Sequence, residues 1–575
     1  MQIPSKLWPY GAVTILFVTV ILLTGPQSYS DTNMYAAAIQ NAASVSDPHL
    51  WDFGHLLWRP AGWLAHRATA PWIEPYLGTS YFVVFPPLIA LNLMAGLASV
   101  LLAFVLAHNA SGRIGVAFAV SGGLLVSSAF LNMTQTGAAY VPGLALQLGG
   151  MAVIVSAVRS NRLGWGAAWL AGALLAASCA VWVAYVLSLP AAGLTVLIWE
   201  RDSLAFNSDA GRQRLVFLAR LTVATFVIGA IVFGLGAAVA GIDSIAEARA
   251  WVSDAGHGYA QTRNWMRIGA GVPRALLDLG NDGMTIKRYL FGDPYARTSL
   301  MDIAGASLWK IVLVHFVLGL TLWGLASSPG GRKLLLPLGA SAAAVLTFAL
   351  AYEAGSAERY LPIYPILILV AAFLCRDFSW RSPTQAALAV LFVAMVCVNL
   401  PNYALATARQ QFEGDIRRIE TTKEILRPGS RVVLLSFRDG IHDFYHRFPF
   451  HPLALEGQLP VYYLTDPMEA RADSWPRRVA QAILGSWQKD GDVWVSRRLF
   501  AGTPLPEWGW VEKDHPGLIW REVAGFFQAL HADKEIGGPD GFLRLLRDEH
   551  NTALVTGIAA GLESDKHSDG RTQGH

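Results

Sequence analysis

An acidic residue and several polar side chains follow the first apolar segment of the chain. Asp31 stands in S-Y-S-D-T-N-M-Y, and Asp52, His55 and Arg59 follow in D-P-H-L-W-D-F-G-H-L-L-W-R-P. A carboxylate at the end of a membrane helix is partly removed from water, which strengthens it as a general base. A guanidinium binds phosphate through its forked donors. These residue types could therefore place a proton-abstracting carboxylate beside an arginine that binds an anion.

Two further segments carry arginines, a residue type that suits phosphate recognition. E-R-Y-L-P-I-Y-P supplies Glu358, Arg359 and Tyr360 at the start of a late apolar segment. His257 and Arg263 belong to a loop in which arginines alternate with aromatic residues. Aromatic side chains favour the headgroup level of a membrane, so a plain interfacial helix would have the same composition. Both interpretations of this loop stay open.

Three of these residues also have a structural interpretation. Asp31 suits the N-cap of the helix that follows it. Arg59 and Arg359 could anchor helix ends at lipid headgroups. Asp52 and His55 do not define a metal site, because the ligand geometry cannot be deduced from one loop. We assign no metal ligands and leave a divalent metal open as a cofactor.

The composition is that of a membrane protein. Hydrophobic residues make up 53% of the 575 residues and charged residues 15%, whereas soluble proteins carry about 25% charged residues. Apolar runs of roughly 18 or more residues can cross a bilayer core of about 30 Å. We expect eleven transmembrane helices, at about 10–25, 82–107, 114–131, 137–158, 164–178, 180–198, 215–240, 307–326, 334–351, 361–374 and 385–401. The pair at 164–178 and 180–198 is short for two full crossings, so one or both should be half-length or tilted.

Basic residues predict how these helices are oriented. Lysines and arginines recur in the loops that share one side with the N-terminus, which places that side in the cytoplasm. The outer loops 26–81 and 241–306 then lie on the extracytoplasmic face. The spans hold almost no ionisable residues, whereas transporters carry such residues near the midplane. We expect chemistry at the outer surface of a bacterial cytoplasmic (inner) membrane.

The composition changes after residue 401, where the membrane module 1–401 should end. Charges become frequent, and R-V-V-L-L-S-F, V-Y-Y-L-T-D and D-V-W-V-S have the pattern of strands. We expect an extracytoplasmic α/β domain over 402–548, followed by a polar, disordered tail over 549–575. The three cysteines lie in apolar segments, and no disulfide is expected.

These features together resemble the GT-C superfamily of membrane glycosyltransferases, in the branch of the protein O-mannosyltransferases and lipid A aminoarabinose transferases. The family's first acidic motif corresponds to D-T-N-M-Y, in which Thr32 replaces the frequent second acid. Its basic residue before proline corresponds to Arg59 in W-R-P-A, and its R-Y-x-L-P-like motif to Arg359 through Pro362. F-R-D-G-I-H-D-F-Y-H-R (437–447) resembles part of the family's C-terminal domain.

The resemblance implies an all-α polytopic GT-C fold with a small extracytoplasmic α/β domain. It implies an inverting glycosyltransferase that moves a sugar from a polyprenyl-phosphate donor to a cell-envelope glycan, lipid or protein. Asp31 would be the catalytic base, and Arg59, Arg359 and Tyr360 would bind the donor phosphate. Supporting roles would fall to Asp52, His55, His257, Arg263 and Glu358.

Other classes remain as alternatives. A lipid-linked glycan transporter or flippase would carry polar groups deep in its spans. A polysaccharide polymerase or ligase would use a lipid diphosphate donor, and the arginines of 249–274 keep it open. A non-catalytic scaffold would not need the acid and arginines. Membrane lipid is an expected partner and nucleic acid is not.

Overall fold

The structure is a computed structural model of the chain. It describes residues 7–27, 31–77, 81–199, 208–255, 268–279, 289, 298–352, 354–406, 429–434, 461–463, 475–500, 512, 519–537 and 541–568. The chain forms two compact units, and each is described by itself. The first comprises residues 1–283 and 306–408, and the second comprises 284–305 and 409–575. The second unit thus begins near the expected boundary at 402 and also takes in part of the loop 241–306.

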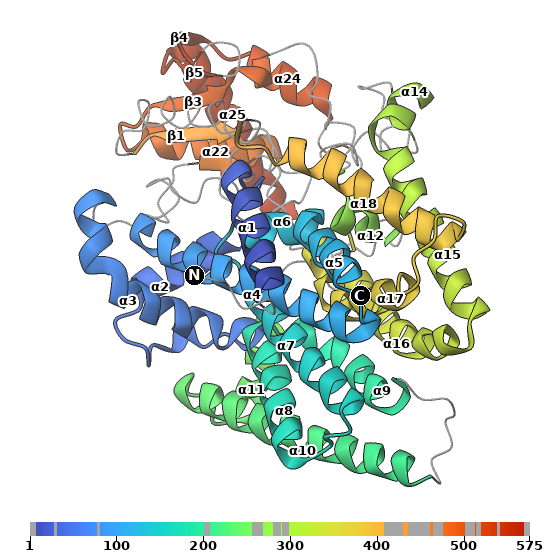
Figure 1. The fold of residues 1–575 in the computed structure, drawn as a ribbon. Helices are drawn as coiled ribbons and strands as arrows, with labels where there is room; N and C mark the ends of the chain where they lie inside the picture. The colour runs from blue at the N-terminus through green and yellow to red at the C-terminus, as the bar shows by residue number, and fades with distance from the viewer. Residues whose placement is uncertain are drawn as a thin grey trace, which may run out of the picture. The chain divides into compact units, whose positions relative to one another are not determined.

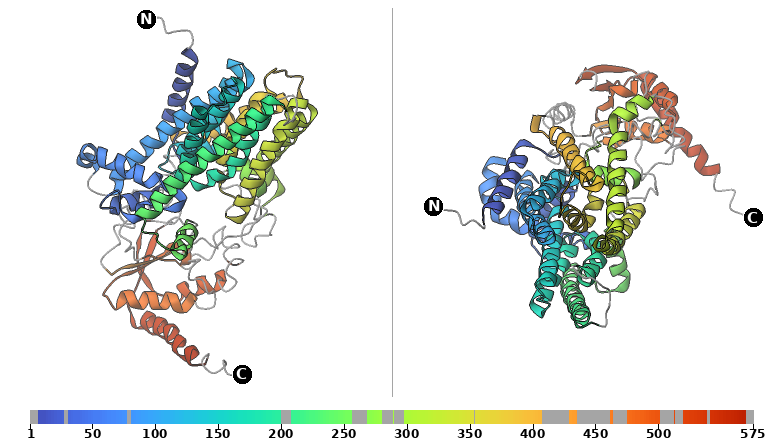
Figure 2. Two further views of the ribbon diagram at one scale, coloured as in Figure 1. Left: turned by 90° about the horizontal axis from the view of Figure 1, so that it is seen from below. Right: turned by 45° about the vertical axis from the view of Figure 1, so that its right-hand side comes forward.

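The first unit is built from helices throughout its described residues (Figure 1). Its α-helices are α1 (Trp8–Leu23), α2 (Thr32–Asn41), α3 (Trp58–Leu77), α4 (Phe85–Ser111), α5 (Ile114–Val126), α6 (Ser128–Thr134), α7 (Tyr140–Arg159), α8 (Trp165–Val181), α9 (Leu189–Ile198), α10 (Asp209–Val239), α11 (Ile245–Asp254), α12 (Ile268–Leu276), α15 (Trp309–Ser327), α16 (Pro329–Ala351), α17 (Tyr364–Leu374) and α18 (Pro383–Asn402). Short 3-10 turns lie at η1 (Pro48–Leu50), η2 (Phe53–His55), η3 (Tyr81–Val84), η4 (Val183–Ser188) and η7 (Ala357–Ile363). Helices α4, α7, α8 and α10 lie side by side in sequence order (Figures 1 and 2).

Seven helical stretches of the described chain are long and apolar enough to cross a membrane: α4, α7, α10, α15, α16, α18 and the joined pair of η7 and α17. Helices α5 and α6 would make an eighth span if taken together, although they are bent by 67°. The remaining expected spans coincide with shorter apolar helices, Trp8–Leu23, Trp165–Val181 and Val183–Ile198. The polytopic helical fold is therefore present, while the number of eleven crossings stays a prediction.

The two short segments expected between residues 164 and 198 have a specific form. Helix α8 ends at Val181, and Trp182 is extended, with φ −148° and ψ 113°. The turn η4 then leads into α9, which is only 10 residues long. At 1.5 Å per residue, such a helix spans about half of a bilayer core. The break at Trp182 places irregular backbone inside the first unit.

Buried polar side chains hold the end of α1, ahead of Asp31. The backbone N–H of Gln27 donates to Asn132 Oδ1 at 2.8 Å, and its side-chain amide donates to Asp278 Oδ2 at 3.1 Å. Lys310, an ionisable residue inside an expected span, donates to the Asp278 carbonyl at 2.9 Å. Paired polar groups tolerate burial because their hydrogen bonds replace those with water. These bonds tie the segment after α1 to α6 and to the residues that follow α12, and they tie those residues to α15.

The second unit contains a five-stranded sheet in the order β2-β1-β3-β5-β4. Its strands are β1 (Arg431–Leu434), β2 (Val461–Tyr463), β3 (Val493–Ser496), β4 (Ala532–Ile536) and β5 (Phe542–Leu545). Strand β1 pairs in parallel with β2 and β3, and β5 pairs antiparallel with β3 and β4. The first three strands match the three segments expected from the sequence, whereas β4 and β5 were not predicted. Helices α14 (Leu300–Ile303), α22 (Trp475–Trp487), α24 (Trp520–Gln528) and α25 (Glu549–Ser568) and the turn η9 (Arg497–Phe500) complete the described elements of the second unit. A π-helical turn, η6 (Ala304–Leu308), includes residues of both units.

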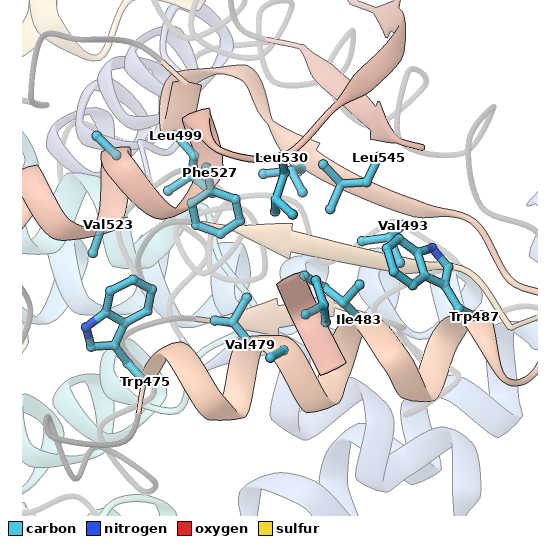
Figure 3. Close-up of a cluster of buried hydrophobic side chains, with 14 of the residues drawn as sticks. Trp475, Val479, Ile483, Trp487, Val493, Leu499, Val523, Phe527, Leu530 and Leu545 are labelled. Atoms are coloured by element: carbon cyan, nitrogen blue, oxygen red, sulfur yellow. The ribbon is translucent and has the colours of Figure 1, made fainter. Parts of the chain in front are cut away.

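An apolar stripe on α22 builds the core of this unit. Trp475, Val479, Ile483 and Trp487 recur every four residues, so they share one helix face. They are buried together with residues of β3, α24 and β5 (Figure 3).

Helix α25 corrects the prediction of a disordered tail after residue 548. It runs over Glu549–Ser568, and Val555 is completely buried in the same core as α22. The polar composition of this region is real, but its few apolar residues fall on one helix face and pack against α22. The prediction of disorder is therefore wrong over these residues.

Candidate active site

Asp31 is held by a tyrosine that lies far away in the sequence. Its carboxylate oxygen Oδ2 accepts a hydrogen bond from the hydroxyl of Tyr140, the first residue of α7. Asp31 occupies the N-cap position of α2, but its side chain makes no capping hydrogen bond to the described backbone of that helix. The carboxylate is thus directed towards α7.

The threonine after Asp31 has a structural task. Thr32 Oγ1 accepts a hydrogen bond from the backbone N–H of Gly137 at 2.9 Å, and Trp58 Nε1 donates to the Gly137 carbonyl at 2.8 Å. Both bonds tie the start of the loop 26–81 to the segment that leads into α7. Thr32, which stands where the resembled motif often has a second acid, therefore helps to place Asp31 beside Tyr140.

Arg359 lies in η7 among aromatic rings. Its guanidinium carbon is 4.4 Å from the ring centroid of Tyr352, 6.0 Å from that of Phe348 and 5.9 Å from that of Trp182. Glu358 Oε1 lies 3.8 Å from Arg359 Nε. The negative charges of Asp31 and Glu358 both act on this guanidinium. Arg359 is therefore a largely buried cation close to the expected base. Its contacts with the faces of the aromatic rings stabilise the buried charge.

Asp52, His55 and Arg59 form a second polar group. His55 Nδ1 lies 3.0 Å from Asp52 Oδ2, and Arg59 Nη2 lies 3.4 Å from the same oxygen. Arg59 Nη1 also donates to the His49 carbonyl at 3.0 Å. The side chains of Asp52 and Arg59 are each only 12% exposed. The short turns η1 and η2 fold the loop so that these residues meet.

Tyr35 lies against the polar group of Asp52, His55 and Arg59. Its ring is 5.6 Å from the Arg59 guanidinium carbon, and it contacts the His55 ring edge-to-face at 5.1 Å between centroids. Complete burial raises the pKa of Tyr35 well above its usual value, and the negative charge of Asp31 raises it further, against the opposing charge of Arg59. Arg359 acts on the same phenol. The charges of Asp31, Arg59 and Arg359 therefore all act on the Tyr35 phenol.

Tyr360 and Glu358 differ in what they contact. The Tyr360 hydroxyl donates to the Ala354 carbonyl at 2.7 Å, and its side chain packs against Gly271, where any Cβ would overlap with it. Tyr360 thus stabilises the backbone around η7, and its proposed contact with a phosphate stays a prediction. Glu358 is buried beside Arg359.

Two predicted site residues and one motif cannot be placed. His257, Arg263 and the segment 437–447 lie outside the described residues. Among the residues that the structure does describe, no three His, Cys, Asp or Glu side chains are grouped to hold a metal.

Sequence reasoning overlooked three aromatic residues of this site. Tyr35, Tyr140 and Trp182 each contact a residue that was predicted to act. Tyr35 is four residues after Asp31, one helical turn, so the spacing could have indicated it. Tyr140 and Trp182 are more than 100 residues away from Asp31 and carried no such signal.

No protein-family model matches the chain, and no curated protein matches it. Its structure is similar to that of ArnT from Cupriavidus metallidurans bound to undecaprenyl phosphate, with 13% identity, a TM-score of 0.46 and coverage of 94% of this chain and 98% of ArnT. The apo state of ArnT gives 12% identity and a TM-score of 0.45 over 95% of this chain and 98% of ArnT. An Archaeoglobus fulgidus oligosaccharyltransferase in complex with zinc and sulfate gives 11% and 0.44, over 93% of this chain and 72% of that one. Similarity at this level concerns the course of the chain and not the chemistry of the site.

Proposed function

We propose that the chain is a membrane glycosyltransferase of GT-C type. It would move a sugar from a polyprenyl-phosphate donor to a hydroxyl group of a cell-envelope glycan, lipid or protein, on the extracytoplasmic face. The observation that carries the proposal is that one carboxylate, Asp31, and two largely buried arginines, Arg59 and Arg359, all act electrostatically on Tyr35.

Buried donors support an anionic ligand. Tyr35 Oη, Arg59 Nε and Arg359 Nε are buried, and none of them has a hydrogen-bond partner among the described residues. A buried donor without a partner costs about 1–3 kcal/mol, and more when the group is charged. Phosphate oxygens accept several hydrogen bonds at once and prefer guanidinium donors. A phosphate group near Tyr35 would satisfy these donors.

The reaction follows from these groups. An acceptor hydroxyl oxygen attacks the anomeric carbon of the sugar, and the bond between that carbon and the phosphate oxygen breaks. The electron pair of the broken bond leaves with the polyprenyl phosphate, whose added charge the arginines stabilise. The acceptor's proton passes to the Asp31 carboxylate. A single displacement of this kind inverts the anomeric configuration.

The membrane supplies the donor's environment. Seven described helical stretches are long and apolar enough to cross a bilayer, and a polyprenyl chain would lie along such helices. We propose that the N-terminus is cytoplasmic and that the second unit is extracytoplasmic, in a bacterial inner membrane, because basic residues mark the cytoplasmic loops.

The test measures transfer from radiolabelled polyprenyl-phosphate sugars by purified protein in proteoliposomes. Asp31→Asn keeps the side chain's shape and removes the base, so transfer should fall about 100- to 10,000-fold. Asp377→Asn is the matched control, because this carboxylate is 80% exposed and pairs with Arg113. The control should transfer at the wild-type rate.

Other outcomes assign the chain differently. Movement of the intact lipid-linked sugar across the bilayer would identify a flippase. Transfer from lipid diphosphates alone would identify a polymerase or ligase. If Asp31→Asn transferred sugar at the wild-type rate, Asp31 would not be the base.

A further inference from the structure

The hydroxyl of Tyr140 has no part in the reaction described above, yet it donates to the expected base. The bond joins Tyr140 Oη to Oδ2 of Asp31. A hydrogen bond on one carboxylate oxygen fixes the plane of the carboxylate and therefore the direction of the other oxygen, Oδ1. Tyr140 is only 1% exposed, so its ring cannot move away without disturbing the surrounding packing.

Tyr140 is itself held by the irregular segment after α8. The Tyr185 hydroxyl donates to the Tyr140 carbonyl at 2.7 Å. Trp182 packs edge-to-face against both tyrosines, at 4.7 Å from Tyr140 and 5.4 Å from Tyr185 between ring centroids. Such aromatic pairs stabilise by about 0.5–1.5 kcal/mol beyond the area that they bury.

The local sequence permits this close packing. Gly143 lies one turn after Tyr140, and a Cβ there would overlap with the ring of Tyr185. Ser178 near the end of α8 donates to the Gly143 carbonyl at 2.8 Å. The absence of a side chain at Gly143 therefore allows Tyr185 to reach the Tyr140 backbone.

Trp182 also contacts the other side of the site. The Arg359 guanidinium carbon lies 5.9 Å from its ring centroid. One indole ring therefore contacts both the tyrosine that holds Asp31 and the arginine expected to bind the leaving phosphate. The extended residue between α8 and η4 sets the distance between base and cation.

We propose that Tyr140 is a positioning residue, which orients the Asp31 carboxylate towards the acceptor hydroxyl, and that Trp182 fixes Tyr140 relative to Arg359. This inference rests on the proposed glycosyltransferase function. It adds two residues that the sequence did not indicate, and it explains why α8 and α9 are separated by an extended residue and a 3-10 turn.

Tyr140→Phe tests the hydroxyl and keeps the ring against Trp182. We expect kcat to fall about 10- to 100-fold with an unchanged KM for the donor, because a misplacement of about 1 Å can cost 100-fold in rate. The acidic limb of the pH–rate profile should also move to higher pH, because the carboxylate loses a donor that favours its charged form. Tyr364→Phe is the matched control, since it removes another buried hydroxyl, bound at 2.8 Å to the Ala275 carbonyl. It should leave the profile unshifted.

Trp182 is tested with Trp182→Phe and Trp182→Leu. The phenylalanine variant keeps an aromatic face and should lose less activity than the leucine variant. Equal losses in the two variants would show that the ring contacts do not position Tyr140 and Arg359.

A second measurement is independent of catalysis. The infrared carboxyl band of Asp31 is identified as the band that Asp31→Asn removes, and its titration is followed in wild type, Tyr140→Phe and Tyr364→Phe. A midpoint at higher pH in Tyr140→Phe alone supports the proposal. An unshifted midpoint overturns it even if the protein transfers sugar. A shifted midpoint in a protein that transfers no sugar would support the role of Tyr140 and contradict the proposed function.

Discussion

Arg59 is bound by polar groups of its own loop, whereas Arg359 lies between aromatic rings. Arg59 Nη2 is 3.4 Å from the Asp52 carboxylate, and Nη1 donates to the His49 carbonyl. Arg359 has the faces of Tyr352 and Trp182 around it. Glu358 Oε1 lies 3.8 Å from its Nε.

If both arginines bind the proposed donor phosphate, this difference gives two ways of stabilising a cation before the phosphate arrives. A carboxylate neutralises part of the charge of Arg59 and occupies one of its terminal nitrogens. Aromatic faces stabilise a cation without using its hydrogen-bond donors, which point along the edge of the guanidinium plane. We infer that Arg359 gives the larger share of phosphate binding and that Arg59 mainly orders the loop.

Replacing Arg359 should have the largest effect. Arg359→Gln removes the charge and the forked donors, and we expect kcat/KM for the polyprenyl-phosphate sugar to fall about 1,000-fold, near the upper end for a lost oxyanion donor. Arg359→Lys keeps the charge and should recover only part of the activity, because an ammonium cannot reproduce the planar contacts. Steady-state transfer rates in proteoliposomes give both values. Full recovery by lysine would mean that charge alone matters.

Replacing Arg59 should have a smaller effect. We expect Arg59→Gln to lower kcat/KM about 10- to 50-fold, because Asp52 already offsets part of its charge, as for other paired charges. The same transfer assay measures it. A greater loss in Arg59→Gln than in Arg359→Gln would reverse the comparison and make Arg59 the principal phosphate ligand.

Replacing Asp52 tests whether its carboxylate acts through Arg59. Asp52→Asn removes the charge that faces Arg59 and His55, so the loop should loosen and the KM for the donor should rise about 2- to 5-fold, the scale of a weak ion pair. A double-mutant cycle with Arg59→Gln measures the coupling. Additive effects of the two substitutions would show that Asp52 does not act through Arg59.

Tyr35→Phe should have the smallest effect on activity and a visible effect on alkaline stability. Burial raises the pKa of Tyr35 above its ordinary value of 10.0, so the unfolded chain ionises this phenol first. The stability linked to Tyr35 is full below about pH 10 and is lost as the pH rises towards the folded value. The melting temperature of Tyr35→Phe should therefore fall less than that of wild type between pH 9 and pH 11. Tyr10→Phe, at a residue that is 39% exposed, is the reference variant.

Most helices of the first unit could be predicted because their signal is local. Apolar runs such as those at α4 and α10 define a membrane helix by length and composition alone. The three predicted strands likewise follow from short β-branched and aromatic runs. Strands β4 and β5 were missed because A-D-K-E-I and F-L-R-L have little alternation and form through their antiparallel pairing.

The sequence by itself indicated a polytopic helical membrane protein, most of its apolar helices, and the acid and arginines that we propose act on a phosphate. It did so because hydrophobic length, charge and side-chain chemistry belong to single segments of chain. Only the tertiary structure decided that Asp31 lies against Tyr140, that Trp182 contacts both Tyr140 and Arg359, and that α25 packs into a core. The longest of these contacts, between Trp182 and Arg359, joins residues 177 positions apart. Which residues meet depends on how whole helices pack, a property that no local pattern carries.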